Sequence, residues 1–462
     1  MNPVALGFAG WASRLRWDAV PAPVRDRLTL RLADGVGLVA AAWDTPPGRV
    51  VRDLAARMSA GGDPATPLLF GGPPVTPAWA ALAHGTLVHA LDYDDTFPAS
   101  VVHPTSVLLP AALAAADAAG TADDVLAAVA AGDELLARLG AAAGRDLHAR
   151  GFQATGVFGP LAAALVVSTL HRRNPATVAA ALGLAGSMSG GLLEFLSDGT
   201  WSKRLHPGWA AHGGVVADAL AAGGFPGPAT VVEGRHGLFA SFLGADLADP
   251  ADPGGVTAGL GETWRSAEAE IKLYPCAHVL HPFIAMARRL RATHRLPPAG
   301  ITEVVCTVAP WHVPIVCEPA AEKRAPVTEY QARTSLPVAV ALALLDDADV
   351  GVASFEPAST DRPELRRLAG RVRYVADSRL SEGFAGRLTV RTADRELTAE
   401  PAGGTDPHPE PRVRDKFTAA ARGDGPATAA LWDAARHLDR HGVAHLRRTA
   451  ADLARSWHPA TP

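Results

Sequence analysis

The chain has 462 residues, of which 48% are hydrophobic, so it can bury a large core and is long enough for two or three domains. A net charge of -4 and an isoelectric point near 6.5 give no reason to expect nucleic acid or an anionic membrane as a partner. The three cysteines are too few and too irregularly spaced for a disulfide framework or a zinc cluster, which favours a reducing, cytoplasmic setting. No signal peptide and no membrane span are expected, because the apolar stretches are short.

The first part of the chain, to about residue 265, is rich in alanine and leucine and has helical periodicity. Pro, Gly, Asn and Asp residues mark the breaks between its segments. The segments predicted to be helical are 25–42, 77–91, 107–119, 122–143, 160–170, 176–190 and 209–223. No internal repeat is visible, so a solenoid is not expected.

The pattern changes near Trp264, where alternating apolar and β-branched residues begin to predict strands. The predicted strands are 301–308, 371–375 and 386–392, and the predicted helices beyond this point are 335–345, 416–421 and 428–438. We therefore expect a mainly α protein with a smaller α+β domain inserted between two parts of one helical domain. The predicted boundaries are 1–267 and 405–462 for the helical domain and 268–404 for the α+β domain.

Lysine is rare in this chain. Lysine and arginine together number 43, but only four of these cations are lysine: Lys203, Lys272, Lys323 and Lys416. A lysine ammonium is a compact charge with a tunable pKa, which arginine does not provide. Lysines that persist against this bias are therefore candidates for functional positions.

The densest group of polar side chains lies between residues 89 and 103. Its members are His89, Asp92, Asp94, Asp95, Thr96 and His103. An acidic segment ahead of a helix start is typical of a site that moves protons beside an anionic substrate. If this segment is helical, Asp92 and Asp95 share a face, one acting in catalysis and the other as a cap or ion-pair partner. A magnesium site would need a second acidic motif, and we find no good candidate.

Three His-Pro steps precede apolar helices: His103-Pro104, His206-Pro207 and His281-Pro282. Proline suits the first helical turn, and the histidine before it would lie where unpaired N–H groups attract anions. Three such helix starts around one cleft would suit a di- or tricarboxylate. The alternative, that each step only begins a helix, stays open.

Two further clusters carry cations. Lys203, Arg204 and His206 lie within four residues, which is sensible where an anion neutralises them; a solvated basic turn is the alternative. Lys272 is followed by a segment that ends in His278 and His281, which are three residues apart and would share a helical face. A metal site there is an alternative, although its spacing is unusual for zinc.

Together these clusters resemble the MmgE/PrpD family, whose members include dehydratases, a decarboxylase and an epimerase. The resemblance rests on the segments 89–96 with 103–104, 201–212, and 272–278 with 281–282. It implies a large all-helical domain with a smaller α+β lid, a homodimer, no cofactor, and an active site between the domains. Carried over position by position, it implies that Asp92, Thr96, His103, Lys203, Lys272 and His278 are site residues. We expect Asp92, His103, Lys203, Lys272 and His278 to be catalytic. We expect the substrate to be bound by Thr96, Gln153, Arg204, His206 and His281.

The sequence departs from the family at Gln153, where many members carry a histidine. Glutamine can bind a substrate but cannot exchange protons near neutral pH. The shared chemistry is proton movement at a carbon beside a carboxylate, with cations stabilising the enediolate-like charge. We expect His103 to be the main acid or base, oriented by Asp92, in a dehydratase or decarboxylase. An isomerase or cyclising enzyme, a metal-dependent lyase and a non-catalytic carboxylate-binding protein are the alternatives.

Overall fold

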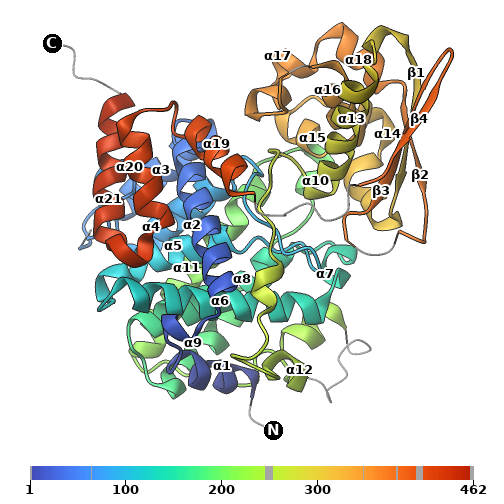
Figure 1. Cartoon of the computed structure of the whole chain (residues 1–462). Coiled ribbons are helices and arrows are strands. Elements are labelled where there is room, and N and C mark those ends of the chain that lie inside the picture. Colours follow the sequence, from blue (N-terminus) through green and yellow to red (C-terminus); the bar gives the residue numbers. More distant parts are fainter. Residues whose placement is uncertain are drawn as a thin grey trace.

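The computed structural model describes residues 3–63, 65–244, 253–346, 348–380, 383–401 and 409–457. Figure 1 shows a large lobe made of helices and a smaller lobe that combines helices with a sheet. The predicted fold class, mainly α with a smaller α+β domain, is confirmed. None of the helices in the described ranges is long and apolar enough to cross a membrane.

The large lobe is built from both ends of the chain. Its N-terminal helices are α1 (Val4–Ala12), α2 (Ala22–Ala42), α3 (Pro46–Met58), α4 (Pro77–His89), α5 (Thr105–Ala115), α6 (Ala122–Ala143), α7 (Asp146–Ala149), α8 (Ala154–Leu170), α9 (Pro175–Gly186), α10 (Phe195–Asp198), α11 (Ser202–Ala222) and α12 (Pro253–Thr257). Its C-terminal helices are α19 (Glu410–Ala420), α20 (Pro426–Arg436) and α21 (Leu438–Trp457). Helices α19 and α20 pack on α2, so the two ends share one hydrophobic core (Figure 1).

The centre of the large lobe is formed by α4, α5, α8 and α11, which pack against one another. Helices α5 and α8 are buried on nearly every side, because their sequences are apolar all round. At Gly85 a Cβ atom would lie 2.6 Å from the Cα atom of Gly208, so α4 and α11 approach backbone to backbone. This close crossing brings the start of α11 next to the segment that follows α4, where the acidic cluster lies.

The small lobe contains a four-stranded sheet with the order β2-β1-β3-β4. The strands are β1 (Ile301–Val308), β2 (Val372–Ala376), β3 (Gly386–Thr392) and β4 (Glu396–Ala399). Strand β1 is parallel to β2 and antiparallel to β3, and β4 is antiparallel to β3. The helices of this lobe are α13 (His281–His294), α14 (Ala320–Arg324), α15 (Glu329–Arg333), α16 (Leu336–Leu345), α17 (Pro357–Thr360) and α18 (Pro363–Ala369).

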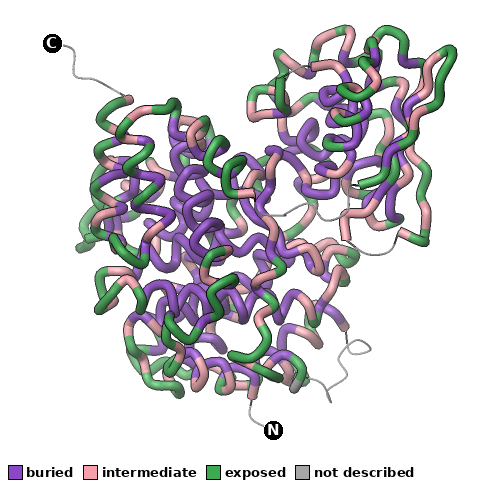
Figure 2. The backbone as a smooth tube through the Cα atoms, viewed as in Figure 1, coloured by how far each residue is buried: buried purple, intermediate pink, exposed green. Residues whose placement is uncertain are grey.

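Each lobe has its own hydrophobic core. Figure 2 shows buried residues inside both lobes, and the second core runs from Tyr274 to Ala399. In Figure 1 the sheet forms the outer edge of the small lobe, with α13 and α16 on its inner side. The change from one core to the other falls between Ile271 and Tyr274. The predicted domain boundary near 268 stays a prediction, and the one at 404–405 lies outside the described residues.

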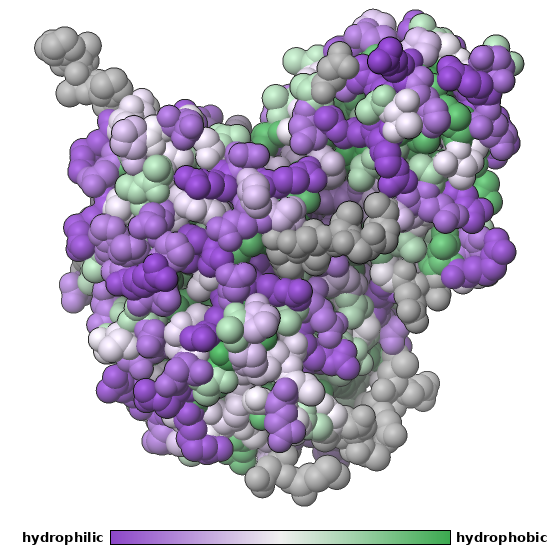
Figure 3. Space-filling view, viewed as in Figure 1, coloured by the Kyte–Doolittle hydropathy of each residue, from purple (hydrophilic) through white to green (hydrophobic). Residues whose placement is uncertain are grey.

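Several predicted elements need correction. Helix α11 begins at Ser202 and α8 at Ala154, so Pro207 and Pro160 lie inside helices and do not mark their starts. The His206-Pro207 step is therefore not a helix start, whereas α13 does begin at His281. Helices α1, α3 and α21 and strand β4 are present but were not predicted. The outward face in Figure 3 is largely hydrophilic, with apolar residues scattered over it.

Candidate active site

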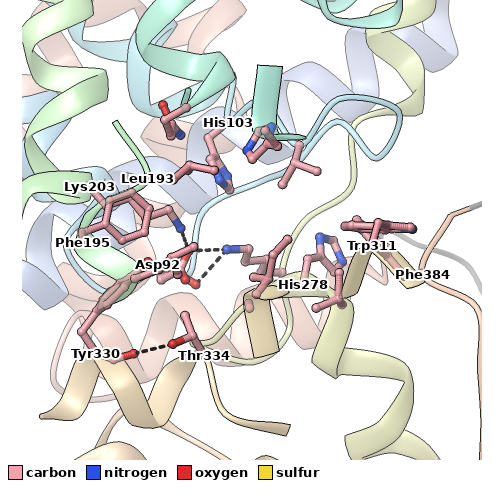
Figure 4. Close-up of a pocket in the computed structure, with 18 residues that line it drawn as sticks. Asp92, His103, Leu193, Phe195, Lys203, His278, Trp311, Tyr330, Thr334 and Phe384 are labelled. Atoms are coloured by element: carbon pink, nitrogen blue, oxygen red, sulfur yellow. Dashed lines mark hydrogen bonds and ion pairs between the residues drawn. The ribbon is translucent and has the colours of Figure 1, made fainter. Parts of the chain in front are cut away.

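A cavity lies where the two lobes meet, lined by residues from both. Its polar and titratable lining residues are Asp92, His103, His148, Gln153, Lys203, Lys272, His278, Tyr330 and Thr334. Its apolar lining residues are Val101, Leu193, Phe195, Leu196, Ala277, Val279, Trp311, Ile315 and Phe384. Figure 4 shows these side chains arranged around Asp92. The cavity brings together all five predicted catalytic residues.

Asp92 holds the two lysines of the cavity. Its Oδ1 atom accepts hydrogen bonds from Lys203 Nζ at 2.7 Å and from Lys272 Nζ at 2.5 Å (Figure 4). All three side chains are buried, and charges that leave water need partners at this range. Burial alone would raise the pKa of Asp92, but the two ammonium groups outweigh it and hold this pKa well below its usual value. The group carries two positive charges against one negative charge.

The backbone also fixes this arrangement. Asp92 has a positive φ of 52°, which a short polar side chain tolerates better than most. Lys272 Nζ donates a second hydrogen bond, of 3.1 Å, to the carbonyl oxygen of Asp92. The segment after α4 is thus a turn, so the prediction that Asp92 and Asp95 share a helical face is wrong.

His103 is held in one tautomer. Its Nδ1 atom donates to the backbone carbonyl of Asp95 at 2.9 Å, with Thr96 Oγ1 at 3.4 Å and Asp94 Oδ2 at 4.0 Å. The Nδ1–H bond to a carbonyl leaves Nε2 unprotonated for the substrate. Burial lowers the pKa of His103 well below its usual value, although Asp94 opposes the shift. Asp94, and not Asp92 as predicted, is the carboxylate nearest this imidazole.

Asp95 has a structural role. Its carboxylate accepts hydrogen bonds from the backbone N–H and hydroxyl of Thr105, at 3.0 and 2.8 Å, and so caps the start of α5. It also pairs with the buried Arg31 at 2.9 Å, which is shared with Asp133. The prediction that one aspartate of the cluster serves as a cap and ion-pair partner is confirmed.

His89, Asp94 and His103 form a group whose ligand atoms lie within 4.8 Å of one another. Their hydrogen bonds account for the arrangement: His89 Nδ1 donates to the Asp94 carboxylate at 2.8 Å, and His103 Nδ1 is bound to the backbone. A metal ion would have to replace these bonds, and the group offers fewer protein ligands than a structural zinc site has. The absence of a metal cofactor therefore stays a prediction.

Gln153 begins α8 and faces the cavity. Its Oε1 atom accepts a hydrogen bond from the Gly156 N–H at 2.7 Å, which caps the helix and fixes the orientation of the amide. The Nε2 atom is buried and has no partner among the described residues. An unsatisfied buried donor is costly, and a substrate oxygen would satisfy it.

Other predicted site residues lie around the cavity. His278 lines it from a 3₁₀ turn at His278–Leu280, and burial lowers the pKa of His278 well below its usual value. Thr96 contacts His103. Arg204, His206 and His281 lie behind the described lining: Arg204 pairs with Glu329 at 2.5 Å, His206 packs on Phe195, and His281 packs on His278. The expected convergence of three helix starts on one cleft does not occur.

Some lining residues were missed from the sequence. His148, on the short helix α7, lines the cavity, and burial and the nearby Lys203 lower its pKa to about 4. Tyr330 lines it from α15, with a buried hydroxyl that has no partner among the described residues. In the small lobe, Trp311 lies in a 3₁₀ turn at Pro310–His312 and Phe384 in a turn before β3. Spacing along the chain gives no signal for any of these positions.

All four lysines are buried. Lys416 Nζ donates to Asp34 at 2.7 Å and to the carbonyls of Tyr93 and Lys272 at 2.6 and 3.0 Å, so it ties α19 to the segments that carry Asp92 and Lys272. Lys323 Nζ donates to the carbonyl of Ile315 at 2.8 Å, and burial lowers its pKa to about 8. The four lysines that the sequence retains are thus all at buried positions, and two of them, Lys203 and Lys272, line the cavity.

Comparison with protein families matches the MmgE/PrpD N-terminal domain over residues 7–250 and the MmgE/PrpD C-terminal domain over residues 274–440. The chain belongs to the MmgE/PrpD family. Among its relatives is the cis-aconitate decarboxylase of Aspergillus terreus, 27% identical over 89% of this chain and 88% of that protein. The human cis-aconitate decarboxylase is 29% identical over 64% of this chain and 61% of that protein. Family membership and these relatives support a lyase of the dehydratase or decarboxylase type.

Proposed function

We propose that the protein is a cofactor-independent lyase that breaks a bond beside a carboxylate by moving protons. The observation that carries this proposal is the buried Asp92 carboxylate between Lys203 and Lys272, in one cavity with His103. The lysine pair has an excess positive charge, which suits a substrate carboxylate. The same charge stabilises the enediolate-like anion that forms when a neighbouring bond breaks.

His103 acts as the base in this scheme. Its Nε2 atom takes a proton from the carbon beside the carboxylate, and Asp94, 4.0 Å from Nδ1, stabilises the imidazolium that results. In a dehydration the electron pair then expels hydroxide, which leaves as water after protonation. In a decarboxylation no proton is removed first: the C–C bond electrons stay on that carbon as CO2 leaves, and His103 in its protonated form delivers the one proton that the carbon needs and regains it from water. His278 faces the same cavity as a second proton carrier.

Gln153 is assigned to substrate binding in this proposal. Its side chain lines the cavity, and its buried Nε2 donor, which has no partner among the described residues, would bind an acceptor of the substrate. The same residue favours a second candidate function, an epimerase or cyclising enzyme. Many family members carry a histidine at this position, which can exchange protons, whereas glutamine can only donate a hydrogen bond there. Retention of stereochemistry and skeleton during turnover would exclude that candidate.

The proposal is tested by proton NMR in D2O with purified protein and a panel of acids that includes cis-aconitate, citrate and 2-methylcitrate. Loss of CO2 or water, or deuterium uptake beside a carboxylate, is expected with at least one carboxylic acid. The His103→Ala variant is expected to lose turnover while it keeps its thermal unfolding midpoint and its affinity for the same acid. Full activity in this variant would show that His103 is not the base, and binding without any exchange would indicate a non-catalytic carboxylate-binding protein.

A further inference from the structure

One side of the cavity is built from large apolar side chains. Leu193 and Phe195 come from the start of α10 in the large lobe, and Trp311, Ile315 and Phe384 come from the small lobe. In Figure 4, Trp311 and Phe384 lie together beyond His278, away from Lys203. Ligand cavities place apolar walls where the ligand itself is apolar, and a few polar groups where it is charged.

The aromatic side chains of this wall pack against neighbouring side chains. The His278 ring stacks on Phe384 with centroids 4.5 Å apart, and Trp311 lies 6.3 Å from Phe384. The Arg145 guanidinium covers the Trp311 ring at 4.1 Å. Trp311, Ile315 and Phe384 are only partly buried, so part of their surface faces the cavity. The wall is therefore preformed and has apolar area to offer.

The charged side chains that line the cavity can neutralise few substrate carboxylates. Lys203 and Lys272 are its cations and Asp92 is its anion, which leaves one positive charge. The nearby Arg204 and Arg333 are both committed to Glu329. Burial lowers the pKa of each lining histidine, which disfavours a positive charge on these rings. A third substrate carboxylate placed against the apolar wall would lose its hydration, and the lining residues offer it no cation besides Lys203 and Lys272, since Arg145 covers Trp311 but is not among them.

On this basis we propose that the substrate is a mono- or dicarboxylate in which an apolar group, up to the size of an aromatic ring, takes the place of a third carboxylate. The carboxylate lies at Lys203 and Lys272, the Gln153 amide donates to a further oxygen, and the apolar group packs on Trp311, Ile315 and Phe384. This inference rests on the proposed function, since it specifies the substrate of the same site.

The experiment compares two acids that differ in one group. In cis-aconitate a carboxymethyl group is attached to the maleate core, and in 2-benzylmaleate a benzyl group replaces it. Isothermal titration calorimetry with the full-length protein is expected to show tighter binding of 2-benzylmaleate by about tenfold or more. The Trp311→Ala variant is expected to weaken the binding of 2-benzylmaleate much more than that of cis-aconitate, and so to remove most of this preference. Phe225→Ala, an exposed aromatic residue away from the cavity, is the matched control and should change neither affinity.

Equal or tighter binding of cis-aconitate by the unmodified protein overturns the inference, and so does a failure of both acids to bind. The same conclusion follows if Trp311→Ala weakens both acids alike, because the wall would then serve the departing carboxylate. Release of CO2 or water is measured separately. Turnover of cis-aconitate with no preference for the benzyl acid would keep the proposed function and reject this inference. Tight binding of the benzyl acid with no reaction of any acid would keep this inference and reject the proposed function.

Discussion

Asp92 shows how one residue sets the chemistry of this site. One carboxylate oxygen receives both lysines, while Oδ2 is buried with no partner among the described residues. The lysines therefore cannot both be neutralised, and they keep an attraction for an incoming carboxylate. An arginine pair would spread the charge over planar groups and could not converge on one oxygen in this way.

Substitutions at Gln153 can separate its two contacts. Gln153→Glu keeps an oxygen for the Gly156 N–H but loses the donor that faces the cavity, whereas Gln153→Ala loses both. We expect both variants to lower kcat/KM by at least about tenfold through the lost hydrogen bond. Only the alanine variant should lose about 1 kcal/mol of unfolding free energy, the usual value of a helix cap. Denaturant titration and steady-state kinetics check this, and unchanged kinetics in Gln153→Glu would remove Gln153 from the site.

The pH dependence of turnover should follow His103. A base works in its unprotonated form, and burial has moved the pKa of His103 well below its ordinary value of about 6.5. Activity should therefore persist as the pH falls through 6.5 and be lost only further down. The measurement is kcat/KM against pH, with circular dichroism at each pH to confirm that the protein stays folded. An acid limb centred at or above about pH 6.5 would contradict the assignment of His103 as the base.

Site residues that lie close together in the sequence could be predicted. Site residues that come together only through the packing of distant segments could not. The cluster around Asp92 and His103 was visible because several titratable types lie close together in the chain. His148 and Tyr330 reach the cavity only because α7 and α15 meet there, which no local pattern records. His206 was placed wrongly because a proline marked a helix start that lies four residues earlier than His206, at Ser202.

At the scale of elements, α11 has two contrasting faces. Its inner face holds Lys203 and the close packing on α4, whereas its outer face exposes Leu205, Trp209 and Leu220, with Trp201 just before the helix. Trp201 is 44%, Leu205 43% and Trp209 49% exposed, and the four-residue spacing puts them on one stripe. Soluble proteins seldom expose such a stripe unless a partner covers it.

We propose that the chain forms a homodimer, which remains a prediction, and that this stripe lies in its interface. Trp209→Asp places a charge in the middle of the stripe and should convert the dimer to a monomer, since buried unpaired charges destabilise interfaces by several kcal/mol. Size-exclusion chromatography with light scattering measures the change. Val327→Asp, at an exposed position of the small lobe, is the control. A dimer that survives Trp209→Asp unchanged would place the interface elsewhere.

At the scale of the whole molecule, the two lobes are joined by polar links beside the site. Arg333 of α15 donates to the carbonyl of Leu91 at 3.1 Å and to that of Pro275 at 2.6 Å. The Arg204–Glu329 ion pair also crosses between the lobes. The Arg333–Leu91 bond and the Arg204–Glu329 pair join segments next to Asp92 and Lys203 to α15, so these contacts between the lobes also position residues of the cavity.

Arg333→Met removes these hydrogen bonds but keeps a long apolar side chain. We expect it to lower the free energy of unfolding by about 2–5 kcal/mol, as buried donors and ion pairs of this kind do, and to lower turnover by about tenfold or more. Hydrogen exchange should rise in segments 89–96 and 272–278, while the core of α8 stays protected. Arg367→Met, an exposed arginine of α18, is the control. Unchanged exchange at these segments would show that the lobes close without this link.

The fold class was predictable because long helices and alternating strands leave strong patterns, as at α6 and β1, whose predicted bounds are those observed. The short helices and β4 were not predicted, because their stability comes from tertiary contacts and not from periodicity. The insertion of one lobe into the other was predicted from the shared helical character of the two ends. The contact of α19 with the site through Lys416 was not predicted, because Lys416 and Lys272 are 144 positions apart in the sequence.

The burial of every lysine has a practical consequence for covalent chemistry. Amine-reactive reagents need an accessible, unprotonated ε-amino group, and in the folded protein none of the four lysine side chains meets that requirement fully. The extent of lysine acylation would then measure the fraction of molecules in which a lysine has become exposed. Mass spectrometry would show which of the four lysines is modified first. Modification of Lys203 and Lys272 before Lys416 would mean that the cavity opens transiently while the helical core stays folded.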